Sequence, residues 1–345
     1  MAMMAVTTNA GQAETAALRR FLLIVVLGWL LLGAGAWAYA RIKLVPAWVA
    51  APVCAAFLIE LPFYLLPGFR ALRDGVESLG GGRLAGAMVV SALLPWLVYS
   101  VPTGVFAFSA FLLLTTIAAA VAFWYVLAPR SGGSDALFLA LLAAIVLDRV
   151  FNRIYADPIP KLHLEYLGHV MLIRLAAMSI LGLRGGSGAE FRFWPTRREW
   201  LAGLRWFAAL LPCVAIVYWS LGLVEWRPHP LGLPLAAATF FGILWVVALS
   251  EEFFFRGLLQ RWLEKWLDPR RAGSRASSIA AVFCASVLFG AAHLGFAHAF
   301  PNWRFSLVAA IAGVFYGFAW RETRTVQSSM VTHALAVTIW RVFLK

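Results

Sequence analysis

Long apolar runs separated by short polar or basic connections dominate the pattern of this chain. Eleven of the runs approach the roughly 20 residues that an α-helix needs to cross a bilayer. We expect spans near residues 21–40, 45–66, 84–101, 105–128, 135–151, 164–183, 203–224, 233–258, 278–296, 305–320 and 327–344. Some of these runs are short, so the expected number is about 8–11. The pattern therefore predicts an all-α, polytopic transmembrane helical bundle.

Composition agrees with a membrane protein. Of the 345 residues, 62% are hydrophobic and only 13% are charged, whereas soluble domains carry about 25% charged residues. The 16 tryptophans fit the same class, because indole rings favour the membrane–water interface. A net charge of +13 could indicate nucleic-acid binding, but no soluble domain is left to present a basic face. We expect the lipid bilayer as a partner and no nucleic acid.

The basic residues orient the chain. If the connections alternate sides, 18 of the 29 Lys and Arg residues fall on the side of the N-terminus and eight on the opposite side. Cytoplasmic loops carry the excess of Lys and Arg, so the N-terminus is expected in the cytoplasm. One missed or additional span would change this assignment.

Three segments are expected along the chain. Residues 1–20 form a polar tail that we expect to be disordered, and residues 21–190 form transmembrane helices of unknown role. Residues 200–345 carry the candidate chemistry, after a boundary rich in glycine and arginine. The N-terminal helices have their own polar residues, for which a structural contact between helices is favoured over a second site. These residues are Glu60, Asp148, Arg149, Glu165, His169 and Arg174.

Two adjacent carboxylates and an arginine interrupt the apolar run at residues 250–257. A charged side chain at membrane depth costs a few kcal/mol, so such a group is expected to be functional. On a helix, Glu252 and Arg256 are four residues apart and can pair. Glu251 projects about 100° away from Glu252 and lacks that partner. One carboxylate is therefore expected to be structural and the other available for chemistry.

Two histidines follow in later apolar runs. His293 lies one turn after Phe289 on the same helical face, and His333 lies near the start of the last run. A carboxylate and two neutral imidazoles can activate water and stabilise an oxyanion. Counted from the starts of their spans, the two histidines differ in depth by roughly 14 Å. Nearby, Gly313 and Gly317 form a GxxxG pattern that predicts close helix packing.

The same glutamates and histidines could hold a metal such as zinc, but the HExxH spacing is absent. We therefore expect no cofactor, and the sequence leaves a divalent metal as an open alternative. The three cysteines, Cys54, Cys213 and Cys284, lie far apart in apolar runs and are read as small buried hydrophobic residues.

Taken together, Glu251-Glu252-x-x-x-Arg256, Phe289-x-x-x-His293 and His333 resemble the CPBP family. This family comprises CAAX prenyl endopeptidases and bacteriocin-processing enzymes, which are intramembrane proteases of the glutamic type. The resemblance covers roughly residues 200–345. The sequence Phe-Arg-Gly at 255–257 is typical of bacterial members, which implies a bacterial inner membrane.

The resemblance also implies a role for each matching residue. Glu251 would be the general base, His293 would help to activate the water, and His333 would help to form the oxyanion hole. Glu252 and Arg256 would hold the site together. Many members carry Asn four residues after the last histidine, where this chain has Val337. A second oxyanion donor would then come from elsewhere, such as Thr338 or a backbone N–H group.

The favoured function is an intramembrane endopeptidase that cleaves a membrane-anchored or lipidated protein or peptide. Nothing in the chain implies a CAAX substrate. A proton-coupled transporter is one alternative, but it predicts related halves with interrupted helices, and no internal repeat is present. A non-catalytic peptide-binding protein of the same fold is another alternative, which predicts the loss of Glu251 or His293. Both residues are present.

Overall fold

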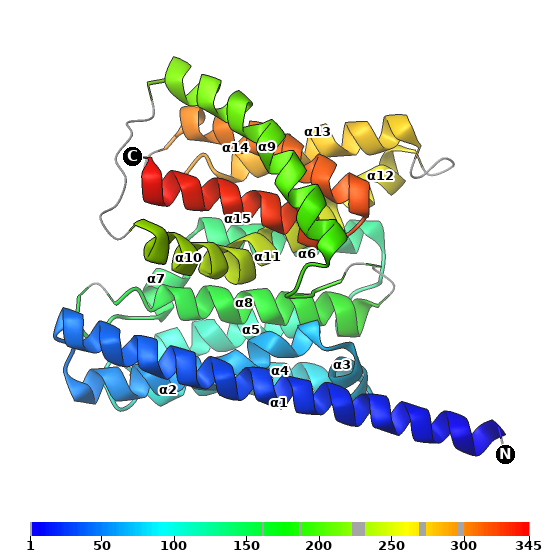
Figure 1. Ribbon diagram of the computed structural model, residues 1–345. Helices are drawn as coiled ribbons and strands as arrows, with labels where there is room; N and C mark the ends of the chain where they lie inside the picture. The colour runs from blue at the N-terminus through cyan, green and yellow to red at the C-terminus, as the bar shows by residue number, and fades with distance from the viewer. Residues whose placement is uncertain are drawn as a thin grey trace. The chain divides into compact units, whose positions relative to one another are not determined.

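Figure 1 shows the computed structural model of the chain. The structure describes residues 15–160, 162–185, 188, 190–222, 232–268, 274–295 and 300–344. Helices and their connections account for these residues, none of which forms a β-strand. The expectation of an all-α helical bundle is therefore confirmed.

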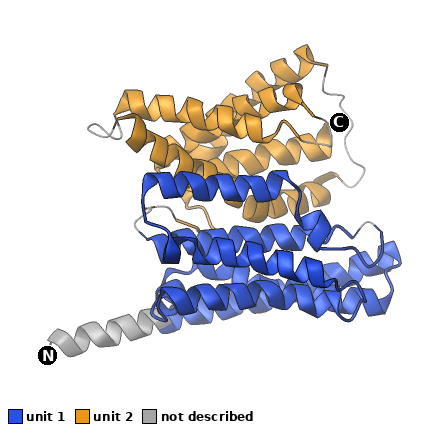
Figure 2. Ribbon diagram, turned by 180° about the vertical axis from the view of Figure 1, so that it is seen from behind, with its two compact units in different colours: residues 1–187 blue, residues 188–345 orange. Residues whose placement is uncertain are grey.

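The chain divides into two compact units, Met1–Ser187 and Gly188–Lys345 (Figure 2). The helices of the first unit are α1 (Ala2–Lys43), α2 (Ala47–Leu65), α3 (Arg70–Glu77), α4 (Gly81–Ser100), α5 (Phe108–Leu127), α6 (Gly132–Leu147), α7 (Phe151–Ile154) and α8 (Glu165–Met178). A short 3₁₀ turn, Leu66–Gly68, follows α2, and a π-helical segment, Ser179–Arg184, extends α8.

The second unit contains the residues singled out for chemistry. Its helices are α9 (Arg197–Ser220), α10 (Gly232–Gly242), α11 (Leu249–Glu252), α12 (Arg261–Leu267), α13 (Arg275–Ala292), α14 (Trp303–Thr323) and α15 (Val326–Phe343). Two π-helical segments, Ile243–Ala248 and Phe253–Gln260, join α10, α11 and α12 into one continuous helix. Helix α14 packs against α9, α13 and α15. π-Helical turns are rare in proteins, and those that occur are often found at functional sites. Their position on both sides of Glu251 and Glu252 therefore supports a functional site there.

Local sequence explains how the helices of the second unit begin and pack. Thr196 and Glu199 form a capping box at the start of α9, which satisfies backbone N–H groups that a helix end leaves open. A Cβ atom at Gly313 would lie 3.1 Å from Arg256 Nη2, and one at Gly317 would lie 2.9 Å from Val282 Cγ1. The expected close packing at GxxxG is thus present, and it brings α13 and the glutamate-bearing helix onto α14.

Nine helices among the described residues are long and apolar enough to cross a membrane. This number lies within the expected range, but two of the eleven expected spans are not among the nine. The run at 135–151 forms α6, which has only 16 residues. The run at 327–344 forms α15, whose first two turns are rich in polar side chains that lower its mean hydropathy. The protein is an integral, multi-pass membrane protein.

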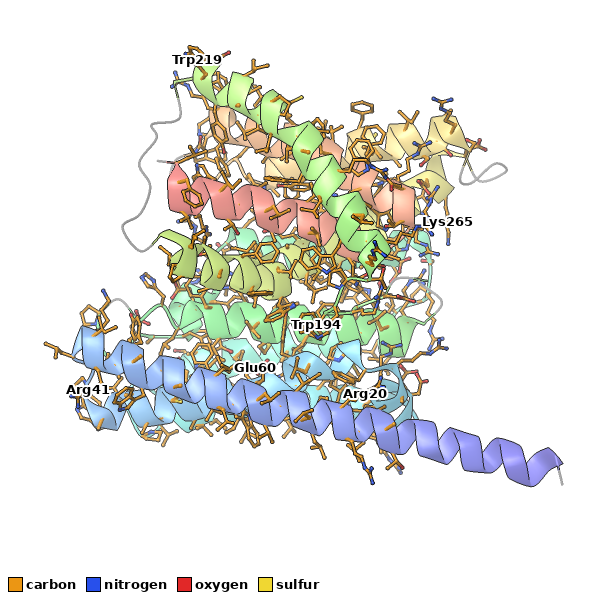
Figure 3. The ribbon with its side chains drawn as sticks, viewed as in Figure 1. Arg20, Arg41, Glu60, Trp194, Trp219 and Lys265 are labelled. Carbon is orange, nitrogen blue, oxygen red and sulfur yellow. The ribbon has the colours of Figure 1, made fainter. Side chains whose placement is uncertain are left out.

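The expected disordered tail falls largely on residues 1–14, which lie outside the described residues. Residues 15–20, assigned to the same tail, are part of α1. Figure 3 labels Arg20 and Arg41, which lie toward opposite ends of the described part of α1. The apolar run between these two arginines is the first candidate span.

The polar residues of the first unit form contacts between helices. The guanidinium of Arg174 on α8 pairs with the Glu60 carboxylate on α2, and its Nη1 donates to Ser91 Oγ on α4 at 2.8 Å. Arg174 and Glu60 are both buried (Figure 3 labels Glu60). The charge of each is compensated inside the unit, as buried charges require. At the end of α6, Asp148 pairs with Arg153 of α7 in an exposed position.

Glu165 and His169 lie four residues apart on α8, but their side chains do not pair with each other. His169 Nδ1 lies 2.8 Å from the backbone carbonyl oxygen of Glu165, while the Glu165 carboxylate lies 3.1 Å from His163 Nδ1. A histidine four residues after a carbonyl can reach that oxygen directly, so the local helix provides its partner.

Candidate active site

Arg256 is the centre of a fully buried charged group. Its Nε lies 3.2 Å from Glu252 Oε2, and neither side chain has exposed surface. Its Nη2 donates to the Gly313 carbonyl at 2.9 Å, and its guanidinium lies 4.6 Å from the centroid of the Phe289 ring. The carboxylate, the carbonyl dipole and the ring together compensate a charge that could not otherwise be buried.

His333 of α15 joins the same group. Its Nδ1 lies 2.8 Å from Glu252 Oε1. A carboxylate only accepts hydrogen bonds, so Nδ1 is the donor, and in the neutral ring Nε2 is then an acceptor. Glu252 therefore holds both Arg256 and His333, which is more than the structural pairing with arginine expected from the sequence.

Glu251 faces the other nitrogen of this imidazole. Its Oε2 lies 3.9 Å from His333 Nε2. This distance exceeds a hydrogen bond, and a polar separation above 3.5 Å can be bridged by water. The same oxygen is buried and has no hydrogen-bond partner among the described residues. The Glu251 side chain is 30% exposed, whereas Glu252 has no exposed surface. Glu251 is thus the carboxylate with capacity for another ligand.

Aromatic rings fix the imidazole from its faces and edge. The Tyr316 ring of α14 stacks on His333 with centroids 4.6 Å apart and planes inclined by 11°. Phe289 meets His333 edge-on at 5.9 Å. Sequence reasoning missed Tyr316, because a tyrosine in an aromatic-rich apolar helix carries no distinguishing pattern. Its position one turn after Gly313 was the only available signal.

His293 is connected to this group through Phe289. It follows the last residue of α13, and its Nδ1 donates to the Phe289 carbonyl at 2.8 Å. The rings of Phe289 and His293 have centroids 4.6 Å apart. Because Phe289 contacts both imidazoles, the depth difference expected from the sequence does not separate His293 from the site. The packing of α13 and α15 on α14 offsets that difference.

Both histidines border one cavity of about 140 Å³. Its walls are mainly aliphatic and aromatic side chains from α9, α14 and α15. The lining residues are Phe207, Leu210, Leu211, Val214, Ala215, Tyr218, Phe289, His293, Phe305, Val308, Ala309, Ala312, Tyr316, His333, Ala336, Val337, Ile339, Trp340 and Leu344. The imidazole rings of His293 and His333 therefore lie at the edge of an apolar cavity.

The position four residues after His333 belongs to this apolar wall. Val337 lines the cavity and can donate no hydrogen bond from its side chain. The hydroxyl of Thr338, one of the donors considered from the sequence, donates instead to the Ala334 carbonyl at 2.6 Å. Threonine commonly bonds the carbonyl one turn earlier in its own helix. Thr338 is therefore not positioned as the second oxyanion donor.

The residues give no separate support for a metal centre. Among the described residues, no group of three or more His, Cys, Asp or Glu side chains is arranged to hold a metal ion. Glu252 and the Nδ1 atom of His333 are already engaged with each other. All three cysteines are free, but Cys54 is only partly buried and Cys213 and Cys284 are exposed, so the expectation that they are buried was wrong.

One comparison with known proteins matches the part of the chain that holds this site. No curated protein and no solved structure matches the chain. Residues 232–339 match the family model described as type II CAAX prenyl endopeptidase Rce1-like. The match spans Glu251, Glu252, Arg256, His293 and His333, and it lies wholly within the second unit. Over residues 232–339 the chain is therefore similar to the type II CAAX prenyl endopeptidases.

Proposed function

We propose that the protein is an intramembrane endopeptidase that cleaves a membrane-anchored or lipidated protein or peptide. The observation that carries this proposal is the 3.9 Å separation between Glu251 Oε2 and His333 Nε2. The two atoms frame a position for water next to an apolar cavity that can receive part of a substrate. The family match over residues 232–339 supports a protease, and we propose residues 200–345 as the protease domain.

In the proposed reaction, a water bridges Glu251 and His333. Its oxygen attacks the carbonyl carbon of the peptide bond while Glu251 accepts its proton. When the C–N bond breaks, Glu251 returns this proton to the departing amine. Neutral His333 accepts the second hydrogen bond of the water at Nε2, because Nδ1 donates to Glu252. His333 then orients the water, in contrast to the oxyanion role implied by the resemblance.

His293 takes a substrate-binding role in this proposal, because it borders the cavity and is held by Phe289. The apolar surroundings strengthen each electrostatic contact, since few water dipoles screen them. The Glu252 carboxylate and Arg256 compensate each other, so only the charge of Glu251 is left to respond to the reaction. We also propose a bacterial inner-membrane location with a cytoplasmic N-terminus, from the excess of basic residues on that side.

The test compares the termini of membrane proteins, by mass spectrometry, in cells that produce the native chain or Glu251→Gln. We expect one or a few membrane-anchored proteins to keep an uncleaved segment only in the Glu251→Gln cells, at equal levels of the two chains. Glu190→Gln is the matched control, because the same chemical change there affects an exposed side chain. Identical termini in all strains would contradict the proposal, and proton flux would then be measured to test the transporter alternative.

A further inference from the structure

The cavity beside the two imidazoles has the size of one side chain. Its volume is about 140 Å³. An engineered protein cavity of about 150 Å³ with aliphatic and aromatic walls binds benzene. Pockets that enclose drug-sized molecules measure about 300–1,000 Å³. The space therefore accepts a single ring or branched aliphatic group.

Small residues on different helices create this space. Ala309 and Ala312 on α14 line the cavity together with Ala336 on α15. Ala309 and Ala312 are also buried in the core cluster that contains Phe289 and Tyr316. Close-packed protein interiors have low compressibility, and even a change of one methylene group affects them. The walls of this cavity therefore adapt little to different occupants. Its shape can therefore discriminate between occupants.

We propose that this cavity binds one large apolar side chain of the substrate, aromatic or branched aliphatic, next to the bond that is cleaved. The inference rests on the proposed peptidase function. His333 borders the cavity and also faces Glu251, so a side chain inserted there brings its own backbone close to the imidazole that orients the proposed water. The cavity thus fixes both the identity of one substrate residue and the place of cleavage.

The physical origin of this selectivity is packing. Lipid tails are as apolar as leucine, so burial alone gives an apolar side chain little advantage over its position in the bilayer. A side chain that fills the cavity gains contacts with walls that otherwise face a void. In a hydrophobic enzyme pocket, one missing methylene changes kcat/KM by about 10- to 200-fold. Because the bilayer competes, we expect the lower end of this range.

The test uses a library of synthetic transmembrane peptides in which successive positions are varied, with the full-length protein in lipid nanodiscs. Mass spectrometry identifies each cut and its flanking residues. For the native chain we expect Phe, Leu or Ile to be favoured over Ala or Gly by roughly 10-fold in kcat/KM at one position beside the cut. Ala312→Leu fills the cavity and should reverse the preference toward Ala and Gly.

Additional variants separate the cavity from general effects on folding. Ala336→Leu fills the same space from α15 and should give the same reversal. Val214→Ala on α9 enlarges the cavity and should extend the preference to Trp. Val314→Leu is the control, because this residue lies on α14 but does not line the cavity. We expect it to keep the native preference.

The outcomes distinguish the two proposals. Cleavage by the native chain without side-chain preference, or a preference unchanged in every cavity variant, would overturn the pocket and leave the peptidase intact. Cleavage that requires an attached prenyl or acyl chain, whatever the side chain, would overturn the pocket in favour of a lipid site. If the native chain cuts no peptide in the library, the peptidase proposal itself is contradicted.

Discussion

The Glu252 carboxylate accepts a hydrogen bond of 2.8 Å from His333 Nδ1, although 81 residues separate the two in the chain. Glu252 also pairs with Arg256, so one buried carboxylate fixes an imidazole and an arginine at once. A carboxylate at one imidazole nitrogen sets the tautomer and orientation of the ring, and thereby the function of the other nitrogen. That other nitrogen faces Glu251.

We predict that Glu252 and Arg256 are coupled in stability. Removal of one partner from a buried ion pair leaves an uncompensated charge and costs about 3–5 kcal/mol. Glu252→Leu and Arg256→Met should each lower the free energy of unfolding by about this amount, and the double variant should lose less than the sum. Denaturant unfolding in detergent micelles measures the three values. Strictly additive losses would show that the two charges are not coupled.

A parallel prediction concerns Glu60 and Arg174 in the first unit. Breaking this pair by Arg174→Met should also cost about 3–5 kcal/mol, and Glu60→Leu in addition should restore part of the loss. Because we assign these residues to contacts between helices, cleavage per folded molecule should stay at the native level in the double variant. A folded but inactive double variant would show that the first unit takes part in the chemistry.

Tyr316 is predicted to position His333 through its ring. Tyr316→Phe keeps the stacked ring and should retain native kcat, whereas Tyr316→Leu removes it. An aromatic pair contributes about 0.5–1.5 kcal/mol, so kcat should fall by roughly 2- to 12-fold in the leucine variant. KM should change as well, because Tyr316 also lines the proposed substrate cavity. Phe318→Leu is the control, because it removes another stacked ring contact of α14, the one between Phe318 and Trp206 of α9. Equal losses in Tyr316→Leu and Phe318→Leu would indicate only a general packing effect.

We predict that a side chain at Gly313 destabilises the protein, because its neighbours would have to shift. A Cβ atom there would lie 3.1 Å from Arg256 Nη2 and 3.2 Å from Ser286 Cβ. Gly313→Ala should therefore destabilise the protein by about 1–3 kcal/mol, as overpacking does. A Cβ atom at Gly242 meets no atom within 4 Å, so Gly242→Ala should be neutral or stabilising. Thermal unfolding of both variants checks the contrast, and equal stability of the two would refute the tight contact.

The sequence predicted those features that depend on spacing within one helix. The pairing of Glu252 with Arg256 follows from four-residue spacing, and the approach of helices at Gly313 follows from the GxxxG pattern. The contact between Glu252 and His333 depends on how two distant helices tilt and shift, which periodicity does not encode. The position of Tyr316 depends on the same packing.

Local contacts explain two departures from the picture that the sequence gives. Thr338 was one of the hydrogen-bond donors considered, but its hydroxyl bonds to the Ala334 carbonyl of its own helix, a choice that residue type alone does not reveal. The run at 327–344 forms the helix α15, but buried polar side chains around His333 lower the mean hydropathy of its first turns, so it is not among the nine candidate spans of the described residues.

The central claim is that Glu251 and His333 activate a water for peptide hydrolysis. We would incubate the purified native chain, Glu251→Gln and His333→Ala in nanodiscs with the transmembrane peptide library in water enriched in heavy oxygen. Mass spectrometry of the products then detects the label at each new carboxyl terminus. The account predicts labelled cleavage products from the native chain and none from either variant. Cleavage by Glu251→Gln at the native rate would contradict it.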